Sequence, residues 1–271
     1  MSNLDFKCAL ITGGGGGIGK ALAEYFISKG KKVLLAGRTE SKIRDTAKEI
    51  GATGYYVFDT GKAAGVPAFV KKITQEHPDL DCLVNNAGVQ RELHPVTDAA
   101  NDMLEKADEE IDINIRGPMH LAVRLLPHFQ RKPSAVIVNV SSVLGFAPTN
   151  IINPVYNGTK AWLHSWSMAL RTQLAQQGSN IRVVEIAPPS VGTDLHRDRE
   201  DPDDNKKHKN PEAMTVEEFM DEIAGKIEKG DAMIAAGPAN KIIDKWYESF
   251  GDFYKSKVGG ADEEIRAKAQ K

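Results

Sequence analysis

Short apolar runs alternate with longer amphipathic or charged stretches along most of the chain. We expect seven of these runs to be β-strands, at residues 6–11, 33–36, 55–58, 82–84, 135–140, 181–186 and 233–236. Short apolar strands separated by helices indicate a parallel sheet that is covered on both faces. Because crossovers between parallel strands are right-handed, the pattern predicts an α/β fold built on a doubly wound parallel sheet.

The stretches between and after these runs have helical character. We expect helices at residues 17–29, 40–50, 66–76, 99–110, 111–130, 155–177, 215–229 and 240–253, followed by a charged tail that frays. No internal repeat or linker divides the chain. Its 271 residues are therefore predicted to form one domain, with a core at 6–195 and a loop and C-terminal helices at 196–271.

Five consecutive glycines, at residues 13–17, join the first expected strand to the first expected helix. Glycines in that place allow a tight turn and let backbone N–H groups approach a pyrophosphate at the N-terminus of the helix. Two registers fit the run, since G-x-G-x-x-G starts at Gly14 and T-G-x-x-x-G-x-G starts at Thr12. A floppy loop is the poorer interpretation, because ordering five glycines costs entropy unless something uses their backbone. The run therefore indicates a dinucleotide site.

The end of the second expected strand bears on the choice between NAD and NADP. An acidic residue there would hold the ribose 2′-hydroxyl of NAD, but the sequence reads Gly37-Arg38-Thr39. Arg38 can bind a 2′-phosphate with paired N–H donors, which favours NADP(H) over NAD(H) as the cofactor. The rival acidic residue, Glu40, is expected in the first turn of the next helix, where a negative charge is stabilised in any case.

Tyr156 and Lys160 are four residues apart in the expected helix 155–177 and therefore share one of its faces. A lysine ammonium beside a phenol favours the phenolate, so the pKa of Tyr156 should fall below its usual value of about 10. Such a phenol can give a proton to a carbonyl oxygen or take one from an alcohol. A hydroxyl from the upstream pair Ser141-Ser142 would polarise the same oxygen.

Five motifs in this chain resemble those of the short-chain dehydrogenase/reductase family, in order and approximate spacing, over residues 6–195. They are the run from Thr12 to Gly19, the block Asn85-Asn86-Ala87-Gly88, Asn114, Ser142, and Tyr156-x-x-x-Lys160. The segment 188–194 also resembles a family element, with Pro189 where glycine is usual. The resemblance implies a Rossmann fold and an NADP(H)-dependent oxidoreductase that acts on a small-molecule carbonyl or secondary alcohol.

The resemblance also implies catalytic roles. Tyr156 would be the general acid in reduction and the base in oxidation, and Lys160 would lower its pKa and bind the nicotinamide ribose. Ser142 would orient the substrate, but it stands one residue farther from Tyr156 than is usual in the family, so Ser141 remains an alternative. Asn114 would hold a water that links Lys160 to solvent, or it would only brace a helix.

The implied cofactor-binding set extends along the whole core. Asp59 would meet the adenine amino group, although a helix cap is an equally good interpretation. The family pairs subunits through the helices that correspond here to 114–130 and 156–177, which implies a homodimer or homotetramer. The implied cofactor-binding residues are Thr12, Gly13, Gly17, Ile18, Gly19, Arg38, Asp59, Asn86, Ala87, Gly88, Tyr156, Lys160, Pro188, Val191 and Thr193.

Residues 195–213 are nearly all polar and show no helical period. The segment is either a solvated or disordered loop or a lid over a site, since it follows the sixth expected strand at the carboxyl edge of the sheet. The expected substrate is mainly apolar, and its candidate contacts are Phe146, Ile151, Ile152, Val155 and Leu195, with Arg91 and His94 near the rim.

Composition argues against several other classes of partner and site. A formal net charge of −2 gives no reason to expect nucleic acid or an anionic membrane as a partner. No apolar run approaches the ~20 residues of a membrane span, and no secretion signal is visible. Cys8 and Cys82 lie in apolar runs, so we expect buried free thiols and a cytoplasmic location. No His/Cys cluster has the spacing of metal ligands.

Two other functions remain open from the sequence alone. The same scaffold could bind NADP(H) as a regulator or catalyse a non-redox reaction, although such relatives usually lose the tyrosine or the lysine. An interaction protein could act through the charged segment 196–209, although charge runs are mostly solvated loops.

Overall fold

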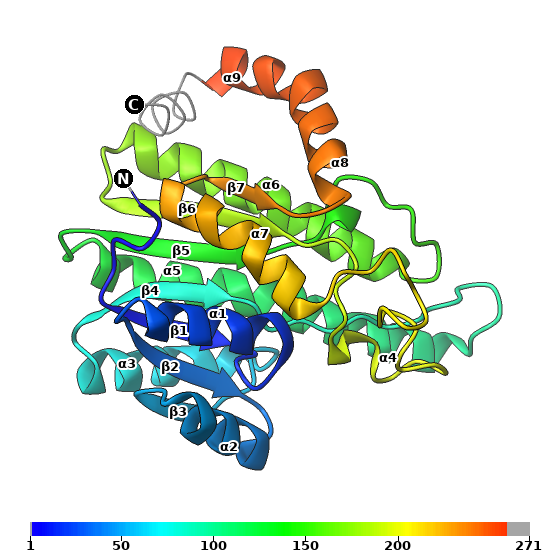
Figure 1. Cartoon of the computed structure of the whole chain (residues 1–271), viewed down its shortest axis with the longest axis horizontal. Helices are drawn as coiled ribbons and strands as arrows, with labels where there is room; N and C mark the ends of the chain where they lie inside the picture. Colours follow the sequence, from blue (N-terminus) through cyan, green and yellow to red (C-terminus); the bar gives the residue numbers. More distant parts are fainter. Residues whose placement is uncertain (1, 259–271) are drawn as a thin grey trace.

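The structure, a computed structural model, describes residues 2–258 (Figure 1). Seven strands form one parallel sheet in the order β3-β2-β1-β4-β5-β6-β7. Their bounds are β1 Cys8–Thr12, β2 Lys32–Gly37, β3 Gly54–Val57, β4 Leu80–Asn85, β5 Ala135–Val140, β6 Ile181–Ala187 and β7 Met233–Ala235. The predicted single domain with a doubly wound parallel sheet is confirmed.

Helices cover both faces of this sheet (Figure 1). The α-helices are α1 Gly17–Ser28, α2 Glu40–Ile50, α3 Val66–Glu76, α4 Ala100–Ile111, α5 Gly117–Phe129, α6 Pro154–Gln176, α7 Val216–Lys229, α8 Ala239–Trp246 and α9 Asp252–Val258. Short 3-10 helices lie at η1 Ala63–Gly65, η3 Val143–Gly145 and η4 Asp194–His196. The predicted frayed tail falls largely on residues 259–271, outside the described residues.

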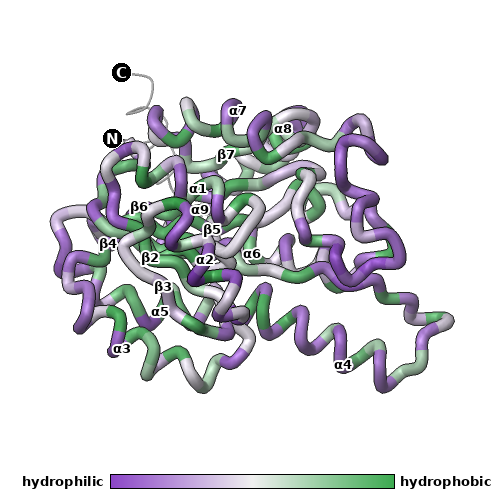
Figure 2. The backbone as a smooth tube through the Cα atoms, turned by 60° about the horizontal axis from the view of Figure 1, so that its bottom comes forward, coloured by the Kyte–Doolittle hydropathy of each residue, from purple (hydrophilic) through white to green (hydrophobic). Residues whose placement is uncertain are grey.

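Each face of the sheet has its own apolar core, because successive strand residues point to opposite sides. One core cluster joins Ile11 of β1 with Phe26 of α1 and Phe219 of α7. The other joins Leu10 of β1 with Phe129 of α5. In Figure 2 the strands are mainly coloured as hydrophobic, whereas α4 alternates between hydrophobic and hydrophilic residues as an amphipathic helix does.

Two helical joints differ from the sequence prediction. The sequence predicted that one helix ends at residue 110 and the next begins at 111. In the structure the π-helical turn η2, Asp112–Arg116, joins α4 to α5 without a break. A second π-helical turn, η5 Tyr247–Gly251, joins α8 to α9, so helix continues to Val258 rather than ending near Phe253. A π-turn carries one more residue per turn and has no separate signature in hydrophobic spacing, so the sequence pattern could not place it.

The polar segment 194–214 also has more structure than a solvated loop. It consists of η4 and a series of turns, and a bridge pairs Val191 with Met214 at its ends. Asn205 and Ala213 are buried inside it.

The loops that matter for function leave the carboxyl ends of the strands. The strand order reverses between β1 and β4, which are neighbours near the middle of the sheet. Ligands of doubly wound sheets bind outside the carboxyl ends of the strands at this point. None of the helices in the described part of the chain is long and apolar enough to cross a membrane.

Candidate active site

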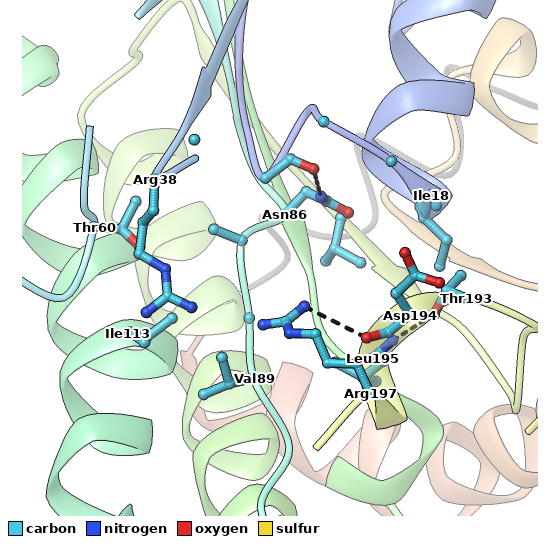
Figure 3. Close-up of a pocket in the computed structure, with 18 of the residues that line it drawn as sticks. Ile18, Arg38, Thr60, Asn86, Val89, Ile113, Thr193, Asp194, Leu195 and Arg197 are labelled. Carbon is cyan, nitrogen blue, oxygen red and sulfur yellow. Dashed lines mark hydrogen bonds between the residues drawn. The ribbon is translucent and has the colours of Figure 1, made fainter. Parts of the chain in front are cut away.

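A cleft of about 460 Å³ opens at the carboxyl edge of the sheet. Its walls come from the segments that follow strands β1 to β6, together with η2 and the start of α6. Figure 3 shows Arg38, Thr60 and Ile113 on one side of this cleft and Thr193 and Leu195 on the other.

The glycine run forms one end of the cleft, and its backbone favours the register T-G-x-x-x-G-x-G. Gly13 and Gly17 have positive φ values, 65° and 52°, which suit glycine. A Cβ on Gly19 would lie 2.5 Å from the carbonyl oxygen of Gly13, which leaves no space for a side chain. Gly14 and Gly16, which belong to the other register, show no such positive φ.

Thr12 and Asn86 hold the glycine run against the segment after β4. The Thr12 hydroxyl accepts hydrogen bonds from the backbone N–H groups of Asn86 and Ala87, both at 3.1 Å. The Asn86 amide donates to the carbonyl oxygens of Thr12 at 3.0 Å and Gly13 at 3.3 Å. Thr12 and Gly19 therefore shape the loop from behind, whereas Gly13, Gly17, Ile18 and Asn86 line the cleft.

Positive side chains stand beside the glycine run. Arg38, directly after β2, lines the cleft, and its guanidinium pairs with Glu109 of α4 at 3.3 Å. Lys42 also lines the cleft and lies across the glycines, with its Nζ 3.5 Å from the position of a Cβ on Gly16. Lys42 pairs with Asp194 at 3.1 Å. This end of the cleft suits an anionic ligand.

Tyr156 and Lys160 lie on one face of α6, which begins with Pro154 in its first turn. Both side chains are about 95% buried and line the cleft. Lys160 Nζ is 5.4 Å from the centroid of the Tyr156 ring and donates a hydrogen bond to the carbonyl oxygen of Val140 at 2.9 Å. The Ser142 hydroxyl also lines the cleft and acts to lower the pKa of the Tyr156 phenol.

The expected fall in the pKa of Tyr156 is wrong for this structure. Burial raises the pKa of the phenol above its ordinary value, and the charge of Glu110 adds to the rise. The Ser142 hydroxyl and the charge of Arg199 act in the opposite direction but are weaker. Burial also lowers the pKa of Lys160 to about 8. Burial is the largest cause of both shifts, and a four-residue spacing cannot reveal burial.

Asn114 lies in the π-helical turn η2 and is buried behind the cleft. Its side-chain amide pairs with both backbone groups of Val89, accepting from N–H at 3.0 Å and donating to C=O at 2.9 Å. It also donates to the hydroxyl of Thr159, the residue before Lys160, at 3.2 Å. The side chain therefore braces the segment after β4 against α6, one of the two roles that the sequence left open.

The two candidate serines have different surroundings. Ser141 donates a 2.5 Å hydrogen bond to the buried carboxylate of Glu185, whose other oxygen meets His164 at 2.9 Å. Ser142 accepts a hydrogen bond from the backbone N–H of Leu144 and acts to lower the pKa of Tyr156. Ser142 is therefore the serine whose hydroxyl acts on the phenol.

Segment 194–214 borders the cleft and is fixed by charged side chains. Arg199 has only 6% of its side chain exposed, and its guanidinium donates to Gln90 at 2.8 Å and Asn153 at 2.7 Å. Asp204 accepts from both Arg199 and His196. Arg91, which was expected near the rim, pairs with Asp198 of the segment.

Many of the predicted site residues line the cleft, but others do not, among them every expected substrate contact except Leu195. Asp59 is absent from its lining, and its carboxylate accepts a hydrogen bond from the backbone N–H of Gly61, as a turn cap does. Phe146 packs against His164 and Trp246, outside the cleft. The predicted residues that line the cleft are Gly13, Gly17, Ile18, Arg38, Asn86, Ala87, Gly88, Ser142, Tyr156, Lys160, Pro188, Val191, Thr193 and Leu195.

Sequence analysis missed Lys42 and Arg197. Lys42 stands four residues after Arg38, one helical turn into α2, and that spacing was a usable signal. Arg197 extends between the two walls of the cleft in Figure 3 and donates to the carbonyl oxygen of Asp194 at 3.4 Å. Its position depends on the path of segment 194–214, for which the sequence held no pattern.

Comparisons with known proteins agree with this geometry. Residues 7–204 match the profile of the short chain dehydrogenases. An uncharacterized oxidoreductase of Bacillus subtilis, DltE, is 36% identical over 192 residues, which make up 71% of this chain and 74% of the relative.

Solved structures show the same similarity. A 3-ketoacyl-(acyl-carrier-protein) reductase from Brucella melitensis, complexed with NADH, is 28% identical, with a TM-score of 0.73 over 87% of this chain and 99% of that one. A short-chain dehydrogenase from Sphingobium yanoikuyae in complex with NADPH gives a TM-score of 0.78 at 24% identity, over 93% of this chain and 96% of that one. The second likeness is one of fold alone.

Proposed function

This chain belongs to the short-chain dehydrogenase family, and we propose that it is an oxidoreductase that moves a hydride between NADP(H) and a carbonyl or secondary alcohol. The observation that carries the proposal is the buried pair Tyr156 and Lys160, which lines the same cleft as Ser142 and the glycine run. A positioned phenol of this kind is a proton donor and acceptor for an oxygen of the substrate.

The residues of the cleft fit a dinucleotide. A Cβ on Gly13 would lie 2.9 Å from Ala87 Cα, and one on Gly17 would lie 3.0 Å from Thr193, so glycine keeps this surface free of side chains. The exposed backbone at the start of α1 suits a pyrophosphate, because helix N-termini carry free N–H groups. Pro188, Val191 and Thr193 would form the wall on the nicotinamide side.

When bound, NADPH would supply the hydride to the carbonyl carbon and become NADP⁺. Tyr156 would give its phenolic proton to the carbonyl oxygen in reduction, and it would take a proton from the hydroxyl group in oxidation. Ser142 would hold that oxygen by a hydrogen bond. Lys160 would stabilise the phenolate by its charge, and Asn114 would hold the segments that carry Val89 and Lys160 in place. Because burial raises the pKa of the phenol, Tyr156 is protonated at neutral pH and ready for reduction.

Replacing Tyr156 by phenylalanine tests the mechanism. Tyr156→Phe removes only the hydroxyl group, so we expect kcat to fall by roughly 10²-fold or more while NADPH binding stays near normal. Turnover would be followed as NADPH consumption across a panel of ketones, aldehydes, quinones and sugars, and binding by fluorescence titration. Tyr55→Phe, at an exposed tyrosine, is the matched control. Near-normal turnover of Tyr156→Phe would contradict the assigned mechanism. A wild type that binds NADPH but turns over no substrate would favour a regulatory role instead.

The preference for NADP(H) rests on Arg38, with Thr39 and Lys42 beside it in the cleft. Arg38→Ala removes a charge-assisted contact to a 2′-phosphate, so NADPH should bind about tenfold more weakly or worse while NADH changes little. Arg44→Ala, at an exposed arginine in the following helix α2 that pairs with Asp45, is the control. Equal losses for both nucleotides would remove the preference.

Two further properties belong to the proposal. We expect a homodimer or homotetramer that forms through α5 and α6, where Val123 is exposed and Trp162 stacks on Trp166. Analytical ultracentrifugation would test this, and a monomer at micromolar concentration would contradict it. We also expect the enzyme to act in the cytoplasm, where the free thiols of Cys8 and Cys82 would stay reduced.

A further inference from the structure

One buried carboxylate near the catalytic pair has no part in the mechanism above. Glu110 is in the last turn of α4, one helical turn before Asn114, and none of its surface is exposed. Burial of a carboxylate costs much free energy unless partners offset it, so a fully buried glutamate needs an explanation.

The hydrogen bonds of Glu110 account for only part of this cost. One carboxylate oxygen accepts a 3.2 Å hydrogen bond from the backbone N–H of Arg91, and the other lies 3.5 Å from the side-chain amide of Asn114. Neither of these donors is a charged side chain. The guanidinium of Arg91 turns instead to Asp198 and Glu109.

The amide of Asn114 joins Glu110 to the surroundings of Lys160. A methyl group on Gly88 would lie 3.3 Å from Asn114 Oδ1 and 3.6 Å from Lys160 Nζ, so both polar atoms face the same small space. The same Asn114 side chain donates to Thr159, the neighbour of Lys160 in α6. Glu110 and Asn114 therefore form a buried polar row that leads from behind the cleft to Lys160 in its wall.

We propose that Glu110 is a positioning residue for the catalytic pair, and that its buried carboxylate keeps Lys160 in the charged form that can act on Tyr156. The inference rests on the proposed function. Lys160 needs such a partner because burial disfavours its ammonium, and the negative charges of Glu110 and of Glu185 in β6 oppose that effect.

The titration of Glu110 fits this role. Burial, with a smaller contribution from the charge of Glu109, raises its pKa to about 7. The Arg91 backbone N–H and the charges on Arg91 and Lys160 oppose this rise. Above neutral pH, where Lys160 would lose its proton, Glu110 is therefore charged. The same charge raises the pKa of Tyr156 in α6, while the charge of Arg199 in segment 194–214 lowers it.

The first test measures the coupling without any turnover. Glu110→Gln, Lys160→Met and the double variant would be compared by urea unfolding at pH 8. If the two charges attract each other, the double variant should lose less stability than the sum of the two single losses. Additive losses within experimental error would overturn the proposal, whether or not the enzyme acts on any carbonyl tried.

The second test uses the pH profile of carbonyl reduction by NADPH. Without the charge of Glu110, both Lys160 and Tyr156 should lose their protons at lower pH. The alkaline fall in kcat of Glu110→Gln should then begin about one pH unit below that of the wild type. Glu105→Gln, which removes an exposed carboxylate from the same helix, should leave the profile in place.

The outcomes separate this proposal from the function on which it rests. A lower kcat in Glu110→Gln with an unchanged pH profile would mean that Glu110 only braces Asn114, and would overturn the charge role. A wild type without turnover would count against the proposed function, and the unfolding measurements would still decide whether Glu110 and Lys160 are coupled.

Discussion

The two ends of the cleft are built in different ways. The glycine run at 13–19 is shaped by backbone conformation and by neutral hydrogen bonds from Thr12 and Asn86. Segment 194–214 is fixed by ion pairs and charged hydrogen bonds, above all those of Arg199. The first end is closely packed, because a Cβ on Gly13, Gly17 or Gly19 would press on neighbouring atoms. The second holds its place because charged groups from distant parts of the chain meet there.

This difference fits the parts that the two ends would take in a reaction. A pyrophosphate needs the same N–H groups in the same places in every cycle, which a tightly packed backbone supplies. A substrate must enter and leave, and the half-exposed ion pairs of the segment, unlike those of the buried Arg199, can be exchanged for water at small cost in free energy. The glycine run should therefore resist local change and fail only with the fold, whereas segment 194–214 should open on its own.

The largest effect is expected from a single methyl group at the glycine end. In Gly19→Ala the new Cβ would lie 2.5 Å from the carbonyl oxygen of Gly13, so backbone must shift. We expect a loss of about 3 kcal/mol in the free energy of unfolding and at least tenfold weaker binding of NADPH and NADH alike. Urea unfolding and fluorescence titration measure the two quantities.

Gly225→Ala is the matched control for that substitution. Gly225 lies inside α7, and a Cβ there meets no atom within 4 Å. Alanine should stabilise the helix by up to about 1 kcal/mol. Unchanged stability in Gly19→Ala would show that the glycine run yields easily, and the contrast between the two ends would be lost.

A smaller and more local effect is expected from the buried arginine of the segment. Arg199→Met keeps much of the side-chain volume but removes the hydrogen bonds to Gln90, Asn153 and Asp204. The free energy of local opening of segment 194–214 should fall by about 2 kcal/mol, with less change in global unfolding. Hydrogen-exchange mass spectrometry of the segment measures the opening.

Lys209→Met provides the comparison for Arg199. Lys209 pairs with Asp201 at 2.6 Å in the same segment, but both side chains are about half exposed, so its loss should change the opening little. If Arg199→Met instead lowered global stability by the full amount, the segment would be part of the core and not an independent lid.

The contrast also explains what the sequence could predict. Strand and helix order followed from local periodicity, and the sheet followed from the handedness of crossovers. Tyr156, Lys160 and the glycine run were visible because each is a local pattern on one element. The contacts that fix segment 194–214 were not visible, since Arg91 and Asp198 are 107 residues apart and no local spacing records their pairing.

The errors have the same origin. The pKa of Tyr156 depends on burial and on Glu110, which comes from a different helix, so the four-residue spacing gave the wrong direction. The cofactor role of Asp59 came from its position after a strand and stays a prediction, since the hydrogen bond that its carboxylate accepts from Gly61 also fits the alternative of a cap. Sequence analysis made no prediction for Glu110, because its burial depends on how α4 packs against the rest of the fold, which local spacing does not record.

The smallest expected effect is a pH dependence of hydrogen exchange that segment 194–214 should show and the glycine run should not. Burial would raise the pKa of Asp204, but hydrogen bonds from His196 and Arg199 hold it below its ordinary value of 3.8. A carboxylate with a lowered pKa stabilises the folded segment above that ordinary value, and the contribution is lost as the pH falls through the folded pKa. Hydrogen exchange in 194–214 should therefore rise below about pH 4, by less than in Arg199→Met. The glycine run has no titratable side chain at 13–19, so its exchange, corrected for intrinsic rates, should stay constant while the fold persists.

Asp204→Asn isolates this effect from that of its neighbour. Burial lowers the pKa of His196, so its protonation removes stability as the pH falls below its ordinary value of 6.5, and this loss precedes that of Asp204. The asparagine variant should keep the rise in hydrogen exchange that follows protonation of His196, but it should lose the rise near pH 4. It should also exchange faster than the wild type at pH 6. If wild type and variant showed the same pH dependence, charge at Asp204 would not hold the segment, and the distinction between a backbone end and an ionic end would have to rest on Arg199 alone.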